Sequence, residues 1–116
     1  MMKAYQKGQV VDVDLGTPPY EVVGHEQAYE RPCIIIKSFN SLGLAIIVPC
    51  TSKQPPNNIY TIVKIPKGFG GFTADSFVLC HQIRTISLDR VIRDRGKLDL
   101  KDILKVHAVL ADMLEL

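Results

Sequence analysis

A loop rich in charged and amide side chains runs directly into an apolar segment in GHEQAYERPCIII, residues 24–36. Its last charged residue, Arg31, stands immediately before Pro32, and proline biases the preceding residue toward extended backbone. A guanidinium on so stiff a base is suited to holding a phosphate with its planar fork of donors. The alternative is a solvated charge where a strand begins, which is the commoner meaning of an Arg-Pro step on its own.

Hydroxyl groups and a lysine follow the next apolar run. Thr51, Ser52 and Lys53 come soon after residues 44–49, which have the composition of a strand buried on both faces. Hydroxyl and ammonium groups at the end of a buried strand can donate to an anion above the sheet. The same residues also suit an ordinary turn before the prolines that follow.

A third polar group belongs to residues 76–86, SFVLCHQIRTI, which we predict to be one strand. Alternation along that strand would place His81 on one face and Gln82 with Arg84 on the other. His81 is either an acid or base with a pKa near neutrality or a satisfied, partly buried histidine.

The composition restricts the class of protein. A chain of 116 residues with 47% hydrophobic and 22% charged residues suits one domain, residues 1–116. Its apolar runs are far shorter than the roughly 20 residues of a membrane span. No secretory signal is recognised at the start, so we expect a cytoplasmic protein. Three widely spaced cysteines show neither metal nor disulfide spacing and fit small core residues: Cys33, Cys50 and Cys80.

The net charge of +2 is unevenly distributed. Acidic residues exceed basic ones in residues 1–30 and 98–116, whereas residues 31–97 carry ten basic residues against three aspartates. Five of the basic residues lie close together: Arg84, Arg90, Arg93, Arg95 and Lys97. Such a bias suits a polyanion or an acidic protein partner, and an ordinary solvated face is the alternative.

Short strands and one terminal helix must position these groups. The pattern predicts strands at 9–15, 33–37, 44–49, 60–65 and 76–86. In the first strand, Asp12 and Asp14 alternate with apolar residues and should face solvent. The connection 16–27 is long enough to expect a functional loop, and the glycine-rich 67–71 should be a flexible turn. These elements predict a small, mainly β barrel or half-barrel.

The C-terminal helix should begin at Asp99 as its N-cap. Its packed face is predicted from a helical stripe consisting of Leu100, Ile103, Leu104, His107, Leu110, Ala111 and Leu114. A second apolar stripe exceeds what one small barrel can cover and predicts a homodimer or a partner protein; it consists of Val106, Val109 and Met113.

Taken in order, five blocks resemble the MazF/PemK/Kid family of toxin endoribonucleases: VVDVDL, GHEQxxxRPCIII, VPCTS, DSxVLCHQIRTI and the leucine-rich helix. The resemblance runs from about residue 8 to the C-terminus. It implies an SH3-like barrel of about five to seven mostly antiparallel strands with a C-terminal α-helix, acting as a homodimer. It also implies cleavage of single-stranded RNA without metal or cofactor, and inhibition by a cognate antitoxin.

The resemblance also assigns residues. Arg31 matches the catalytic arginine, Thr51 the catalytic threonine or serine, and Glu26 an acidic position near the cleft. His25 and His81 depart from the family pattern, in which serine and aspartate are common, so they leave the proton-transfer roles open. The expected RNA-binding residues are Gln27, Ser52, Lys53, Gln82, Arg84, Tyr20 and Tyr29.

The chemistry can be compared with the side chains independently. Cleavage of RNA by its own 2′-hydroxyl leaves a 2′,3′-cyclic phosphate or 3′-phosphate and a 5′-hydroxyl; it needs a base, donors for the charged phosphorus centre and an acid. Arg31 suits charge stabilisation but is a poor proton donor, because its pKa lies above roughly 12. Thr51 suits donation to a phosphate oxygen. Glu26, His25 and His81 are alternatives for proton transfer.

Two other functional classes are alternatives. One is a non-catalytic SH3-like module that binds RNA or protein through the basic middle of the chain. The other is a gyrase poison like CcdB, which acts through C-terminal residues; this chain ends in DMLEL, without the aromatic residue used there.

Overall fold

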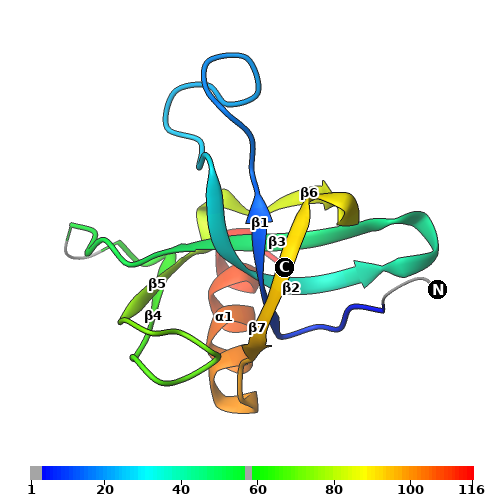
Figure 1. The fold of residues 1–116 in the computed structure, drawn as a ribbon. Helices are drawn as coiled ribbons and strands as arrows, with labels where there is room; N and C mark the ends of the chain where they lie inside the picture. Colours follow the sequence, from blue (N-terminus) through cyan, green and yellow to red (C-terminus); the bar gives the residue numbers. More distant parts are fainter. Residues whose placement is uncertain (1–3, 57–58) are drawn as a thin grey trace.

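The computed structural model describes residues 4–56 and 59–116, which form a seven-stranded antiparallel sheet with one helix packed against it (Figure 1). The strands and helix are β1 (Gln9–Asp14), β2 (Glu30–Phe39), β3 (Leu44–Thr51), β4 (Ile62–Ile65), β5 (Ser76–Leu79), β6 (Arg84–Ser87), β7 (Val91–Lys97) and α1 (Leu100–Met113). Their order is β4-β5-β3-β2-β1-β7, with β6 also paired to β3. The predicted mainly β fold with a C-terminal helix is confirmed.

The central strands are buried on both faces. In β1, Val10 belongs to the core cluster beneath α1, whereas Val11 belongs to a second cluster on the opposite face. In β2, Ile34 and Ile35 divide between the two clusters in the same way. A strand with both faces covered cannot slip by one residue without exchanging every side chain between the clusters, so the register is strongly specified.

The predicted continuous strand at 76–86 is wrong. A 3₁₀ turn, Cys80–Gln82, separates β5 from β6. β5 pairs with the end of β3 at Cys50 and Thr51, and β6 pairs with its beginning, from Leu44 to Ile47. Two short strands therefore share one edge of β3, and the chain has to turn between them.

β7 was not predicted, because its residues are charged and mostly exposed and show no apolar alternation. It is held instead by pairing with β1 and by ion pairs to Asp12, which is 3% exposed. The prediction that Asp12 faces solvent is therefore wrong. Its carboxylate accepts from Arg93 Nη1 at 2.7 Å and from Arg95 Nη1 at 3.1 Å, and Arg93 also bonds Glu30.

The helix begins as predicted, with the Asp99 carboxylate accepting from the N–H of Asp102. The predicted packed face of α1 is wrong, because the helix is rotated about its axis relative to that prediction. Leu100, Leu104 and Leu114 are exposed, whereas the second apolar stripe packs against the core with Ile103 and Leu110; that stripe is Val106, Val109 and Met113. Amphipathic spacing alone could not choose between two apolar stripes on one helix.

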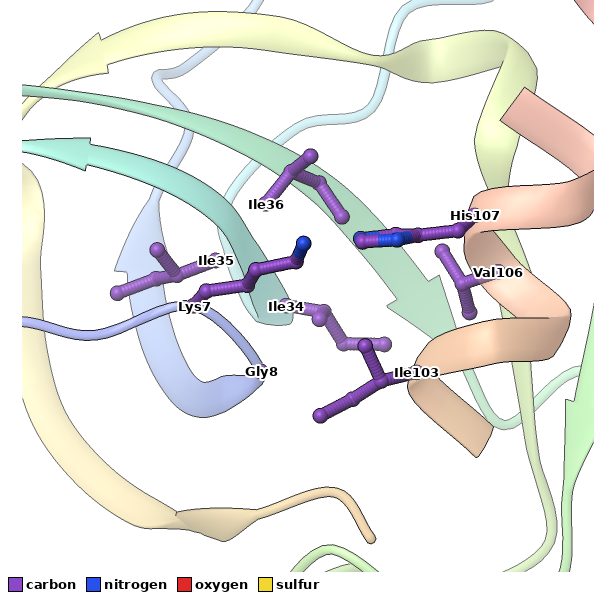
Figure 2. A pocket seen from close by; sticks show the side chains of 8 residues that line it. All are labelled: Lys7, Gly8, Ile34, Ile35, Ile36, Ile103, Val106 and His107. Carbon is purple, nitrogen blue, oxygen red and sulfur yellow. The ribbon is translucent and has the colours of Figure 1, made fainter. Parts of the chain in front are cut away.

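Ile103, Val106 and His107 face β2 and the segment before β1 (Figure 2). Ile34 and Ile36 line the same contact, and Lys7 extends toward the His107 ring (Figure 2). His107 thus packs against apolar groups, as predicted, but beside an ammonium group that the sequence pattern did not reveal.

All three cysteines are buried and free. Burial raises the pKa of the Cys80 thiol to about 11 and raises those of Cys33 and Cys50 as well. They are core residues, as predicted. In the part of the chain that the structure describes, no helix is long and apolar enough to cross a membrane.

The environment of His107 predicts a pH-dependent stability. Burial and the ammonium of Lys7 lower the pKa of His107 from its ordinary value of 6.5. The unfolded chain then binds more protons than the folded one just below that pH, so stability is lost as the pH falls. Thermal unfolding at neutral and mildly acidic pH should show a smaller acid-induced loss for His107→Gln than for the wild type. Equal losses would contradict this, since His25 and His81 are present in both proteins.

Candidate active site

A cleft of about 200 Å³ lies where the adjoining ends of β2 and β3 meet the segment after the glycine-rich turn. It brings together three of the predicted site residues, Arg31, Thr51 and Ser52. The β2–β3 register pairs Cys33 with Pro49, and two residues beyond that pair stand Arg31 and Thr51. Both strands extend past that last pair, β2 to Glu30 and β3 to Thr51, and bring the two side chains into the wall of the same cleft.

Arg31 is the second residue of β2 and pairs with Val13 of β1. Its Nε–H donates to the carbonyl oxygen of Ala28 at 3.2 Å. That bond orients the guanidinium and leaves both Nη groups available to a ligand. The half-buried Pro32 follows in the strand, so Arg31 does have the extended backbone that the sequence predicts.

Thr51 is the last residue of β3. Its Oγ1 accepts from the backbone N–H of Lys53 at 3.1 Å. A hydroxyl that accepts one hydrogen bond still has its own proton to donate. Thr51 is therefore part of a turn and still has a hydroxyl proton to donate into the cleft. The two interpretations of this segment, an ordinary turn and a donor to an anion, are compatible.

The opposite wall of the cleft comes from the glycine-rich turn and β7. Phe72 and Arg95 line the cleft there, and the Arg95 guanidinium lies 5.8 Å from the Phe72 ring centroid. Gly71 has φ +80, and a Cβ on it would lie 2.2 Å from the carbonyl oxygen of Arg95. Only glycine permits this contact. The glycine-rich turn, which we predicted to be flexible, is instead packed against β7.

The proton-transfer candidates lie elsewhere. Glu26 does not line the cleft; its Oε1 accepts from the N–H of Val23 at 2.7 Å within the long loop. His81 is exposed and its Nδ1 lies 2.8 Å from the hydroxyl of Thr61. His25 is exposed, and its carbonyl oxygen accepts from Gln82 Nε2 at 2.9 Å. Gln82 thus ties the 3₁₀ turn to the loop.

The remaining RNA-binding predictions are spread over the surrounding surface and stay predictions. Tyr20 is 95% exposed and Tyr29 is exposed, and both belong to the loop that stands out from the sheet between β1 and β2 (Figure 1). Arg84 is half-buried in β6 opposite Ile47. The other two are the half-buried Gln27 and the exposed Lys53.

Several residues of the cleft were not assigned to the site from the sequence, among them Glu30, Phe72 and Arg95. Arg95 was noticed only as one member of a basic cluster, because β7 was not recognised as a strand. Glu30 stands next to Arg31 in the sequence, which is the one signal that could have found it. In residues 4–56 and 59–116, no three His, Cys, Asp or Glu side chains gather as metal ligands.

Comparisons with known proteins agree with the resemblance. The family model described as PemK-like, MazF-like toxin of type II toxin-antitoxin system matches residues 6–114. Endoribonuclease EndoA of Bacillus subtilis (strain 168) is 34% identical over 91 residues, which are 74% of this chain and 73% of that protein.

Two solved structures show the same fold. MazF (Form-I) from Deinococcus radiodurans has a TM-score of 0.80 at 22% identity, covering 98% of this chain and 99% of that chain. An endoribonuclease in complex with its cognate antitoxin, from Mycobacterial species, has a TM-score of 0.74 at 22% identity, covering 97% of each chain. The predicted family and enzyme class, endoribonuclease, are confirmed, and the chain belongs to the PemK-like, MazF-like toxins of type II toxin–antitoxin systems.

Proposed function

We propose that this protein cleaves single-stranded RNA in the cleft between β2 and β3, through attack of the RNA's own 2′-hydroxyl on the adjacent phosphate. One observation carries the proposal: Arg31 and Thr51 each have one polar group held by the backbone and further donors available to the same cleft. The products would be a 2′,3′-cyclic phosphate, or a 3′-phosphate after its hydrolysis, and a 5′-hydroxyl.

The two residues suit the charge that develops on phosphorus. As the 2′-oxygen attacks, negative charge grows on the non-bridging oxygens, and donors already in place stabilise it without reorganising. The Nη groups of Arg31 would bind one non-bridging oxygen as a fork, and the Thr51 hydroxyl would donate to another. Neither step needs a metal ion.

Proton transfer has two carboxylate candidates. Glu26 is favoured by the family resemblance, whereas Glu30 is favoured by position, because it lines the cleft beside Arg31. A base must come within hydrogen-bond reach of the 2′-hydroxyl, directly or through one water. His25 and His81 remain alternatives for the acid that protonates the leaving 5′-oxygen.

The cleft continues into a larger groove that suits an extended strand. Ser52, Thr73 and Ala74 line both the cleft and a neighbouring groove of about 470 Å³. Lys64 and Lys67 line that groove and could bind the phosphates of adjoining nucleotides. Asp75 pairs with Lys64 at 3.7 Å and accepts from the backbone N–H of Lys67, which keeps both lysines near the groove.

The partners follow from the family. The mycobacterial relative is in complex with its cognate antitoxin, and we propose that this chain is likewise inhibited by a cognate antitoxin. The exposed leucines of α1 support the homodimer: Leu100, Leu104 and Leu114. A cytoplasmic location suits a protein whose substrate is RNA.

The proposed roles of Arg31 and Thr51 can be tested by RNA cleavage. With chelator present, the wild type should cut a long single-stranded RNA but not the matching DNA, which has no 2′-hydroxyl. Arg31→Ala and Thr51→Val should remain folded and cut about two to three orders of magnitude more slowly. RNA binding without cleavage would favour the non-catalytic module, and damage to supercoiled DNA in the presence of gyrase would favour the poison.

The two carboxylates can be separated by the pH dependence of cleavage. If Glu30 is the base, Glu30→Gln should remove the acidic limb of the pH–rate profile while Glu26→Gln retains it. The reverse result would assign the base to Glu26. Retention of the limb in both variants would exclude both carboxylates and turn attention to the histidines.

The long loop should determine which sites are cut. It is closed at its base by hydrogen bonds between Leu15 and Tyr29 and between Tyr29 and Gly16, outside the β2–β3 register that sets the cleft. Shortening residues 18–23 should therefore change the cleavage pattern on a long RNA more than it changes the melting temperature. An unchanged pattern would contradict this expectation.

A further inference from the structure

We propose that Arg95 binds a second phosphate in the cleft, next to the scissile one, and that the buried Asp12 is its positioning residue. The inference rests on the proposed cleavage of RNA in this cleft. Arg95 comes from β7, far in sequence from Arg31 and Thr51, yet it lines the same cleft. A single strand of RNA that presents one phosphate to Arg31 must place its neighbours along the adjoining walls.

The Arg95 guanidinium is held from three directions. Its Nη1 donates to Asp12 Oδ1 at 3.1 Å, and its Nη2 donates to the carbonyl oxygen of Gly71 at 3.4 Å. The Phe72 ring lies against it, with the guanidinium carbon 5.8 Å from the ring centroid. Asp12 itself is almost inaccessible, with 4% of its side chain exposed. A carboxylate so deeply buried holds its partner more rigidly than a surface ion pair would.

Arg95 still has donors for a ligand. A guanidinium has five N–H groups in a planar fork. Within residues 4–56 and 59–116, Asp12 and Gly71 accept the hydrogen bonds that this side chain donates. The side chain is 24% exposed, and the cleft is the open space that it lines. A phosphodiester oxygen in the cleft could accept from the remaining N–H groups.

The charge balance of the network supports an anion at this position. Glu30 pairs with Arg93, and Asp12 bonds both Arg93 and Arg95, so these four groups cancel. Arg31 donates to a carbonyl oxygen and adds a positive charge to the same cleft. Together these five groups carry one net positive charge, that of Arg31, which lines the cleft with Arg95.

The glycine-rich turn fixes the backbone of Arg95 as well. Gly71 packs so closely on the Arg95 carbonyl that no side chain fits there, and a Cβ on Gly96 would lie 3.3 Å from the carbonyl oxygen of Gly70. The turn therefore holds both Phe72 and Arg95 in the cleft wall. A residue kept only for its ion pair with Asp12 would not need this second support.

Arg93 provides a structural control. It bonds the same carboxylate, but its side chain is 56% exposed and it does not line the cleft. Arg93→Gln and Arg95→Gln each remove one partner of Asp12 and one positive charge. Arg93→Gln also leaves the cleft residue Glu30 without its ion pair, so this variant controls only for the stability of the Asp12 network. Lys97→Gln removes one charge from the same strand outside the cleft. Arg95→Lys keeps the charge without the planar fork, so it should restore part of the function.

The first measurement is binding of a mixed-sequence single-stranded RNA made of 2′-O-methyl nucleotides, which cannot be cut because the attacking hydroxyl is blocked. Its dissociation constant would be followed against salt concentration for the full chain. Arg95→Gln should weaken binding about tenfold, as expected for one lost charge-assisted hydrogen bond. It should also lower the slope against log salt by about 0.7, the value for one phosphate contact in a single strand. Lys97→Gln should keep the wild-type slope.

The second measurement locates the phosphate. Oligonucleotides that contain a mapped cleavage site would have one linkage at a time replaced by a neutral methylphosphonate. In the wild type, neutralising the phosphate beside the scissile one should raise KM, whereas Arg95→Gln should no longer respond to that replacement. Folding of each variant would be checked by thermal unfolding, and Arg95→Lys serves if Arg95→Gln is unfolded.

The outcomes separate this inference from the proposed function. If the wild type cuts RNA but Arg95→Gln behaves like Lys97→Gln in both measurements, the Arg95 site is wrong and the cleavage proposal stands. If the wild type binds RNA with a slope that depends on Arg95 but cuts nothing, the Arg95 site stands and the cleavage proposal fails. If the wild type neither binds nor cuts RNA, both fail.

Discussion

The burial of β2 on both faces is the constraint on which the rest of the structure depends. Its alternating side chains enter two separate core clusters, and both its edges are paired, with β1 and with β3. Any shift in register would exchange the two sets of side chains, so the strand has one position. Arg31 and Thr51 lie on β2 and β3, each two residues past the last β2–β3 pair. The most precisely placed side chains of the cleft thus owe their position to the core rather than to a loop.

A second constraint links the ends of the chain. The acidic residues of β1 and of the start of β2 pair with arginines of β7, and Arg90 lies 3.9 Å from Glu21 of the loop. Part of the basic excess of residues 31–97 is therefore neutralised by acidic residues of the same chain. Arg31, which donates to a carbonyl oxygen and forms no ion pair among the described residues, keeps its positive charge in the cleft.

The sequence was sufficient for the parts of the fold that are set by local pattern. The apolar runs located β2 and β3, the N-cap at Asp99 located the helix, and the Arg-Pro and Thr-Ser segments gave two walls of the cleft. It was insufficient where an element is stabilised by distant residues. β7 is held by ion pairs to Asp12, which no window of neighbouring residues shows, so Arg95 was not placed in the cleft. The prediction of which face of α1 is packed failed for a related reason, because either apolar stripe could have faced the core.

The molecule divides chemistry and recognition between parts of different rigidity. The groups suited to stabilise charge on phosphorus lie on strands in the middle of the sheet, where a displacement would disturb both core clusters. The candidates for reading the RNA sequence lie on the β1–β2 loop, whose contacts with the body include the Gln82 bond to His25 and the ion pair between Arg90 and Glu21. Loops of this kind tolerate changes in length and sequence. Substitutions in the loop can therefore alter the sites that are cut while the geometry at Arg31 and Thr51 is retained.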